Sequence, residues 1–170
     1  MKNIRTLIVA AITAAVTSTS FAGNGKSAAA AAAKPGTSTI VAIVLADDRE
    51  FDVLQAAVVK AGLVDALNGK GQYTVFAPTD AAFIKALGVV DEAAAIAAVN
   101  ALPVEALTNI LLYHVTGGRR ISTSVLAASE YLMLNGEYLS RIELAAAGIA
   151  KTDISASNGV IHVINSVLIP

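Results

Sequence analysis

The pattern of apolar and polar residues predicts helices along much of the chain. Between Thr39 and Asn68, large apolar residues recur three or four positions apart, as on one face of an amphipathic helix, and Gly62 interrupts the run. Three further helices are expected: one that begins at Thr79 or Asp80, one over Glu92–Val99, and one that has Pro103 as its first residue and ends near Tyr113.

Other segments have the pattern of strands. Residues Gln72–Ala77 are rich in β-forming residues, and Pro78 ends the run. The segments Tyr131–Leu134 and Tyr138–Ile142 flank Asn135–Gly136, which is a hairpin signal. The apolar segment Val160–Ile164 is continuous, which predicts a central strand buried on both faces. Because helices dominate the first part and strands the last, the pattern predicts an α+β fold.

The N-terminus has the three parts of a cleavable secretory signal. Lys2 and Arg5 supply positive charge, Leu7–Val16 form an apolar run of about ten residues, and Ser20–Ala22 end in a small-x-small pattern. The run is shorter than the roughly 20 residues that a membrane-spanning helix needs, although an uncleaved anchor is the alternative. We therefore assign residues 1–22 to a signal peptide.

Residues 23–38 are low in complexity and contain six consecutive alanines, Ala28–Ala33. They include no large apolar residue, so we expect a linker. Residues 39–170 are expected to form one domain. Its core must be sufficient for stability without disulfides, because the chain has no cysteine.

Charge and hydropathy limit the partners of this domain. Without Lys2 and Arg5 the chain has 10 basic and 13 acidic residues, so neither nucleic acid nor an anionic membrane surface is an expected partner. Charges, Gly or Pro interrupt every later apolar segment, so no integral membrane anchor is expected after the signal.

Three segments occur in a characteristic order: Tyr73–Phe83, Leu111–Val115 and Asn158–Pro170. In this combination the chain resembles a fasciclin (FAS1) domain protein of the single-domain type that bacteria secrete. The resemblance extends from about Thr37 to Pro170. It implies a wedge-shaped β-sandwich with an N-terminal helical side, and a role in adhesion outside the cytoplasm.

Most residues of the matching motifs are expected to be structural, because a buried strand, a proline and a capped helix together fix a strand-to-helix corner. These positions are Thr74, Phe76, Pro78, Thr79, Asp80, Phe83, Gly159, His162 and Asn165. Asn165 stands where the family usually has aspartate. The segment Leu139–Asp153 is shorter than usual, with Ala145–Gly148 where a strand is expected, which predicts that one β-hairpin is reduced or missing.

The resemblance also indicates two candidate binding pairs. In animal relatives, adhesion to integrins is attributed to the region that matches Tyr113–His114 and to a pair that matches Asp153–Ile154. Asp153 is a short carboxylate suited to accept a hydrogen bond or to bind a cation, while Ile154 is expected to pack inward. The two pairs are therefore candidates for a binding surface, and the partner stays open.

The sequence contains no pattern typical of an enzyme. His114 and His162 are its only histidines, and both lie among aliphatic residues with no carboxylate at metal-ligand spacing. Buried core histidines are the simpler interpretation, and a metal pair formed in space is the alternative. There is no Gly-x-Ser-x-Gly elbow or phosphate-binding loop. We expect no catalytic residue, metal or cofactor.

Arg119–Arg120 is the one concentrated positive spot, and it could hold a carboxylate or an acidic sugar or could be a solvated loop. The sequence thus favours a non-enzymatic adhesion or interaction module, secreted or periplasmic, that binds a surface protein or a polysaccharide. The alternatives are a periplasmic carrier or sensor of a small ligand, and a hydrolase. An exposed apolar patch would favour adhesion, and a deep apolar pocket would favour a carrier.

Overall fold

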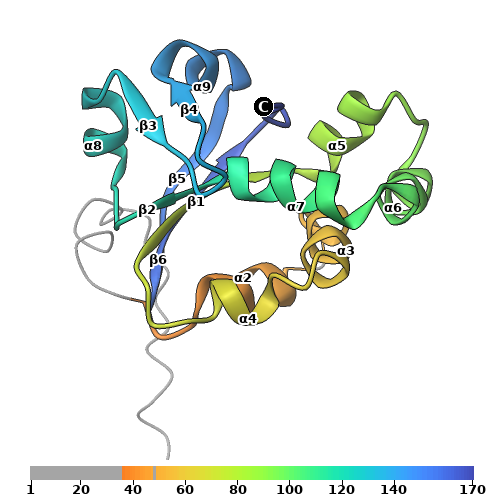
Figure 1. Ribbon diagram of the computed structural model, residues 1–170, viewed down its shortest axis with the longest axis horizontal. Coiled ribbons are helices and arrows are strands. Elements are labelled where there is room, and N and C mark those ends of the chain that lie inside the picture. The colour runs from red at the N-terminus through yellow and green to blue at the C-terminus, as the bar shows by residue number, and fades with distance from the viewer. Residues whose placement is uncertain (1–35, 48) are drawn as a thin grey trace, which may run out of the picture.

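The computed structural model describes residues 36–47 and 49–170. The signal peptide predicted at 1–22 and most of the linker predicted at 23–38 lie outside the described residues. In the described part, a sheet occupies the middle, one group of helices lies on one side of it, and a small hairpin with two short helices lies at the other end (Figure 1).

The described elements alternate between helices and strands along the chain. The helices are α2 (Ile40–Ala46), α3 (Asp52–Lys60), α4 (Val64–Leu67), α5 (Asp80–Leu87), α6 (Glu92–Ala101), α7 (Val104–Tyr113), α8 (Ser122–Ala127) and α9 (Arg141–Ala147). The strands are β1 (Tyr73–Pro78), β2 (Val115–Gly117), β3 (Glu130–Leu132), β4 (Tyr138–Ser140), β5 (Ile149–Ala156) and β6 (Gly159–Ile164).

The larger sheet has the strand order β2-β1-β6-β5. The central strands β1 and β6 are parallel and place Val75 beside Ile161 and Phe76 beside His162. The outer strands are antiparallel to them. Every residue of β6 is buried, which confirms the central strand predicted for Val160–Ile164.

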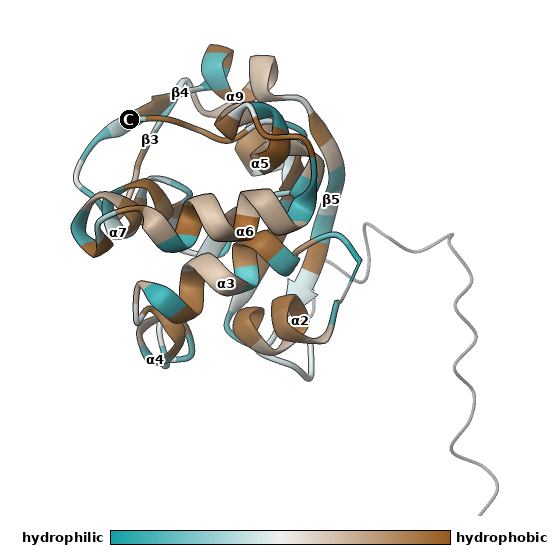
Figure 2. Cartoon of the chain, turned by 90° about the vertical axis from the view of Figure 1, so that its right-hand side faces the viewer, coloured by the Kyte–Doolittle hydropathy of each residue, from teal (hydrophilic) through white to brown (hydrophobic). Residues whose placement is uncertain are grey.

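The helical side covers one face of this sheet and holds the larger hydrophobic core, in which Ile40, Phe51, Val99, Leu111 and Ile161 are buried. Figure 2 shows that α2, α3 and α6 are largely apolar, and Val41, Val53 and Val99 are among their buried residues. Helix α5 begins as predicted, because the side chain of Thr79 accepts a hydrogen bond from the backbone N–H of Ala82.

The second core lies under the hairpin of β3 and β4. Tyr131 and Phe76 are its largest fully buried members, and Leu139, Leu144 and Ile164 are fully buried with them; Phe76 and Ile164 come from the larger sheet. An isolated bridge between Thr116 and Met133 connects the hairpin to the edge strand β2. The hairpin predicted around Asn135–Gly136 is thus present, and Gly136 has a φ of 91° that favours glycine.

The structure corrects the prediction for Leu139–Asp153. The strand predicted over Tyr138–Ile142 ends at Ser140, where a reciprocal capping box between Ser140 and Glu143 begins α9. The alanines at 145–147 end this helix, and the edge strand β5 follows them. The sheet therefore keeps β5 as an edge strand paired with β6, while the residues at 145–147, where the family resemblance implies a strand, are helical.

Two smaller differences concern helices. Pro103 is the N-cap of α7 and precedes the first helical residue, whereas the sequence placed it inside the helix. Helix α8 was not predicted. The α+β class is confirmed, with the two-stranded sheet of β3 and β4 beside the four-stranded one.

Candidate functional site

The first motif, Tyr73–Phe83, forms a strand-to-helix corner at which the start of α5 meets the start of α3. Pro78 ends β1, and Thr79 caps α5. The carboxylate of Asp80 points away from its own helix and accepts hydrogen bonds from the backbone N–H groups of Asp52, at 3.2 Å, and Val53, at 2.9 Å. These are the first two residues of α3, whose N-cap has no side-chain acceptor, so Asp80 caps α3 from a distant part of the chain.

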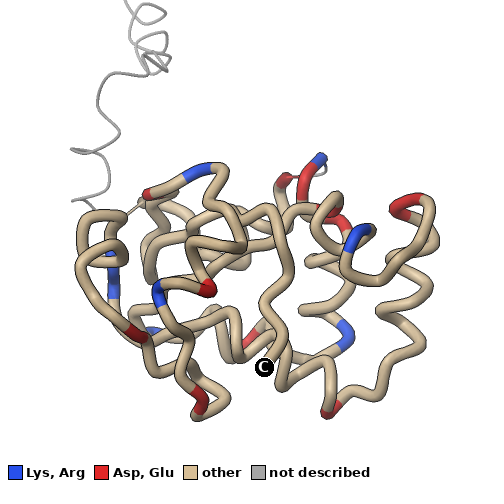
Figure 3. Tube along the Cα trace, turned by 90° about the horizontal axis from the view of Figure 1, so that it is seen from above, with Lys and Arg blue, Asp and Glu red and all other residues tan. Residues whose placement is uncertain are grey.

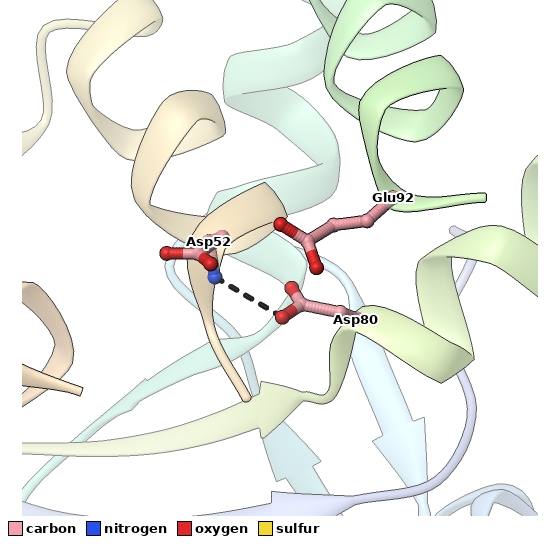
Figure 4. Close-up of side chains that lie close together, drawn as sticks. All are labelled: Asp52, Asp80 and Glu92. Carbon is pink, nitrogen blue, oxygen red and sulfur yellow. Dashed lines mark hydrogen bonds between the residues drawn. The ribbon is translucent and has the colours of Figure 1, made fainter. Parts of the chain in front are cut away.

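Asp52, Asp80 and Glu92 come together at this corner, with one oxygen of each within 4.8 Å of the others (Figure 4). Each is the first residue of its helix, where the positive end of the helix dipole stabilises a carboxylate. Local loss of solvent and then the negative charges of Asp52 and Asp80 raise the pKa of Glu92. In the described ranges this is the only group of three such side chains that could hold a metal ion.

The geometry of this acidic cluster is explained without an ion. Both oxygens of Asp80 already accept backbone hydrogen bonds from α3. Each carboxylate also lies at the positive end of its own helix dipole, which offsets part of the repulsion among the three. The cluster was missed in the sequence because its members lie 12 to 40 positions apart, and in it Asp80 joins α5 to α3.

His162 is fully buried and connects two strands to a loop. Its Nδ1 accepts a hydrogen bond from the backbone N–H of Asp153, at 3.3 Å, so the proton is on Nε2, which donates to the carbonyl of Arg120, at 2.9 Å. The ring stacks on Phe76 with centroids 5.8 Å apart. Burial lowers the pKa of His162, so the ring stays neutral.

His114 has the opposite tautomer. Its Nε2 accepts a hydrogen bond from the backbone N–H of Leu168, at 2.9 Å, and its Nδ1–H donates to the carbonyl of Ile110, at 2.8 Å. Burial lowers the pKa of His114 to about 4. Both ring nitrogens of both histidines are therefore occupied by backbone groups, and neither ring can act as a metal ligand or a general base as the structure stands.

The candidate pair Asp153–Ile154 lies on the edge strand β5, and its two side chains have different surroundings. Asp153 has a φ of 63°, and its carboxylate accepts hydrogen bonds from the backbone N–H and the hydroxyl of Ser122, at 2.7 and 2.5 Å. Ile154 packs against the larger core. Because β5 and β2 are opposite edges of the sheet, the structure does not bring Asp153 together with Tyr113–His114, which precedes β2.

The two arginines are held against the protein. Arg119 donates to the carbonyl oxygens of Ala156, at 2.8 Å, and Gly159, at 2.6 Å. The guanidinium of Arg120 lies over the ring of Tyr131, 5.6 Å from its centroid. The solvated loop considered from the sequence is therefore wrong for both residues, and Arg119 acts as a brace between the loop and the turn that joins β5 to β6.

The other motif positions have structural surroundings. The hydroxyl of the fully buried Thr74 donates to the carbonyl of Gly118 and accepts from the N–H of Arg120, both at 2.8 Å. Phe76, Pro78, Phe83 and Gly159 are buried. Asn165 is exposed at the end of β6, and its N–H donates to the carbonyl of Gly148.

Asn158 is a buried polar residue whose structural role the sequence analysis did not assign. Its side chain accepts from the N–H of Ile40 and donates to the carbonyl of Leu67, so it connects α2 and α4 to the β5–β6 turn. Its position before Gly159 was the only signal, and it indicated a turn.

Two mostly apolar hollows adjoin α7, and we call them together the α7–hairpin surface. The first, of about 440 Å³, is lined by Val104, Glu105, Thr108, Asn109, Leu112, Leu134 and Asn135. The second, of about 290 Å³, is lined by Tyr113, Leu139, Glu143, Ala146, Ala147, Ser166, Val167, Leu168 and Ile169. Of the residues predicted to bind a partner, Tyr113 is the one that lies on this surface.

Large apolar side chains are exposed on and next to this surface. The exposed fraction is 45% for Val104, 41% for Leu134 and 71% for Ile169, and Tyr138, whose carbonyl accepts from the Tyr113 hydroxyl, is 62% exposed. The exposure of Leu134 and Tyr138 was not predicted, because both residues were expected to pack in the strands of the hairpin.

A third feature is a small apolar cavity of about 30 Å³ between the sheet and helices α2, α3, α4 and α7. His114 is its only polar lining residue, and both nitrogens of that ring are already hydrogen-bonded. An apolar cavity stays dry, but this one is well below the roughly 150 Å³ of an apolar cavity that binds benzene or xenon.

Comparisons with known proteins show the family of this chain. The family model of the fasciclin domain matches residues 49–170. The chain belongs to the fasciclin family. Protein sll1483 of Synechocystis is 36% identical to this chain over 160 residues, which cover 85% of this chain and 81% of that protein.

Longer proteins of the family match over a small share of their length. The pig transforming growth factor-beta-induced protein ig-h3 is 38% identical over 135 residues, which cover 75% of this chain and 19% of ig-h3. A solved FAS1 domain pair from the insect cell adhesion molecule fasciclin I covers 80% of this chain and 52% of that chain, with a TM-score of 0.53 and 17% identity. This last likeness shows the fasciclin fold alone.

Within the described ranges, no single helix is long and apolar enough to cross a membrane. Only together do helices α6 and α7 have the length and apolar composition of a membrane-spanning segment, and they are bent by 116° where they meet.

Proposed function

We propose that this fasciclin domain is a non-enzymatic interaction module that works outside the cytoplasm and binds a surface protein or a polysaccharide. The observation that carries the proposal is the α7–hairpin surface, where Val104, Leu134, Tyr138 and Ile169 are large, apolar and exposed. Apolar side chains gathered in this way are typical of sites that bind another molecule.

The use of the polar groups supports a role without catalysis. His114 and His162 are neutral and hydrogen-bonded to the backbone. Ser122 bonds directly to Asp153, with no histidine between them to accept its proton. Among the described residues that we considered from the sequence, none forms the pair of nucleophile and base that a hydrolase needs.

Export is supported by the sequence of residues 1–22. A module of this kind acts by attaching to something else at the surface. Its partner therefore determines its function, and the exposed apolar residues of the α7–hairpin surface are the ones that we expect to make the contact.

A sedimentation experiment tests the proposal. The purified chain is mixed with washed envelopes of the source organism, the envelopes are pelleted, and the chain is measured in both fractions. We expect it in the pellet, and we expect Leu134→Ser to shift it to the supernatant while Val90→Ser, at a position 90% exposed, does not. Wild-type chain that stays in the supernatant would contradict the proposal.

The apolar cavity favours a second candidate function, a carrier or sensor of a small apolar ligand. Thermal unfolding in the presence of benzene tests this function. Because the cavity of about 30 Å³ is smaller than the roughly 150 Å³ of a cavity that takes up benzene, binding requires the helices to move apart, and we expect benzene to raise the Tm of the wild type only if they do. Val44→Phe, which fills the cavity, should show no change with benzene. Circular dichroism confirms that the variant is folded, and an unchanged wild-type Tm would refute the carrier function.

A further inference from the structure

We propose that the α7–hairpin surface binds a cationic amphipathic segment of a partner protein, with Lys or Arg on either side of a stripe of apolar side chains. This inference rests on the proposed function, because it names the chemistry of the partner for the same surface. It follows from the shape of the two hollows, from the sign of the charges around them, and from the contacts that hold them open.

The two hollows offer places for apolar side chains that are next to each other on one helix. Leu112 lines the first hollow and Tyr113 the second, so the C-terminal half of α7 separates them. Leu134 forms part of the wall of the first, and Leu168 and Ile169 form part of the wall of the second. A segment that crosses α7 can place one apolar side chain in each hollow, as an amphipathic segment does with its apolar face.

The charges on this surface all have one sign. Glu105 lines the first hollow and Glu143 the second, and no Lys or Arg lines either of them. Burial, followed by the negative charges of Glu143 and Glu137, raises the pKa of the Tyr113 hydroxyl, so both carboxylates act on the point where α7 meets the hairpin. Figure 3 shows acidic positions on both sides of the C-terminus along this edge of the molecule.

This charge selects among possible occupants. Carboxylates repel nucleic acid and anionic lipid. An uncharged polysaccharide can donate hydroxyl hydrogen bonds to carboxylates, but it has no apolar side chains to fill the two hollows. A second copy of the chain, packed symmetrically, would bring Glu105, Glu137 and Glu143 of both copies into one interface and add repulsion. A segment with Lys or Arg beside its apolar residues pairs with these carboxylates and fills the hollows at the same time.

The hollows are held in shape before anything binds. The side-chain amide of Asn135 donates to the side chain of Asn109 across the first hollow, at 3.2 Å. The hydroxyl of Tyr113 donates to the carbonyl of Tyr138, at 3.4 Å, and the N–H of Leu134 donates to the carbonyl of Val115, at 2.8 Å. Because the hairpin is tied to α7 in this way, binding requires little reordering of the surface.

The test uses fluorescence anisotropy with the purified chain and a short, labelled amphipathic peptide of Leu and Lys. Two control peptides replace Lys by Glu or Leu by Ser. We expect the Leu/Lys peptide to bind and both controls to bind at least tenfold more weakly. Binding should weaken as salt is added, because part of the attraction is between exposed charges.

Matched variants locate the binding. We expect Leu134→Ser to weaken binding of the Leu/Lys peptide roughly tenfold, and the double variant Glu105→Gln/Glu137→Gln to weaken it by a similar factor and to reduce its salt dependence. Val90→Ser and Asp65→Asn change exposed residues of the same kinds outside the two hollows, and they should bind like the wild type.

The inference is overturned if the Leu/Glu peptide binds as well as the Leu/Lys peptide, or if the control variants lose as much affinity as Leu134→Ser. It is also overturned if sedimentation shows a dimer that Leu134→Ser dissociates, because a second copy then occupies the surface. Envelope binding without peptide binding refutes this inference and leaves the proposed function standing. Peptide binding that follows the variants, without envelope binding, refutes the proposed function alone.

Discussion

The helical side of the sheet buries polar side chains, whereas the hairpin side exposes apolar ones. On the helical side, polar motif residues such as Asp80 and Asn158 are buried and their polar atoms are hydrogen-bonded to backbone groups of other elements. On the hairpin side, apolar residues such as Leu134 and Tyr138 are exposed, although Leu139, which follows Tyr138 directly, is fully buried.

The comparison shows where this fasciclin domain has capacity to bind. A buried polar group with all its hydrogen bonds made contributes stability and has nothing left for a ligand. An exposed apolar side chain contributes little to stability and gains free energy when a partner covers it. The signature motifs therefore maintain the fold, and the less distinctive hairpin sequence supplies the surface.

The largest effect is expected at Gly159, on the structural side of the comparison. A Cβ atom at this position would overlap the backbone carbonyl oxygen of Tyr73 in the neighbouring central strand. We expect Gly159→Ala to lower the free energy of unfolding by about 3 kcal/mol or more, as measured by urea denaturation. Gly117→Ala is the matched control, since a Cβ there has no atom within 4 Å, and an equal loss in the two variants would contradict the argument.

Acid should weaken the domain through His114. An unfolded histidine binds a proton below a pKa of 6.5, whereas the buried ring does so only near a pKa of about 4, so stability is full above pH 6.5 and falls between these values. The shift corresponds to about 3 kcal/mol. Urea denaturation from pH 7.5 to 4.5 measures the loss, and His114→Gln should reduce this slope and leave the contribution of His162, whose pKa burial also lowers. A slope that is unchanged in His114→Gln would contradict the assignment.

A smaller loss is expected when Asp80 is removed. In Asp80→Ala the two backbone N–H groups of α3 lose their acceptor, and the expected cost is about 2 kcal/mol. Asp91→Ala, which removes the exposed N-cap of α6, should cost about 1 kcal/mol. Thermal unfolding compares the two variants, and an Asp80 variant no weaker than the Asp91 variant would show that capping between helices is unimportant.

The smallest effect on stability is expected on the hairpin side. Leu134→Ala should change the free energy of unfolding by no more than about 0.5 kcal/mol, because Leu134 is exposed. Leu139→Ala, five residues along the same hairpin, should cost about 3 kcal/mol because Leu139 is buried. Similar losses in the two variants would mean that Leu134 belongs to the core and has no apolar surface to offer a partner.

The sequence predicted those parts of the fold that depend on neighbouring residues. The corner at Pro78–Thr79 and the central strand at Val160–Ile164 are specified by local chemistry, and both are present. Helix α9 was missed although its signal was visible, because Ser140 and Glu143 have the spacing of a capping box before an alanine run. Strand β5 was not predicted, because polar residues recur in it and its pairing with β6 shifts in register, so its sequence lacks the regular pattern of a strand.

The candidate binding surface was harder to predict than the fold. Tyr113 was identified through the family resemblance, but its neighbours Leu134 and Glu143 come from the hairpin and α9. Their meeting depends on tertiary packing between elements 20 or more residues apart. The acidic cluster of Asp52, Asp80 and Glu92 was missed for the same reason.

The parallel pairing of β1 with β6 also determines when the domain can fold. Tyr73 pairs with Gly159, so the centre of the sheet joins strands at opposite ends of the domain. Pairing over this sequence distance is slow, because the intervening chain must first close as a loop. The four-stranded sheet therefore cannot be completed until β6 has been synthesised.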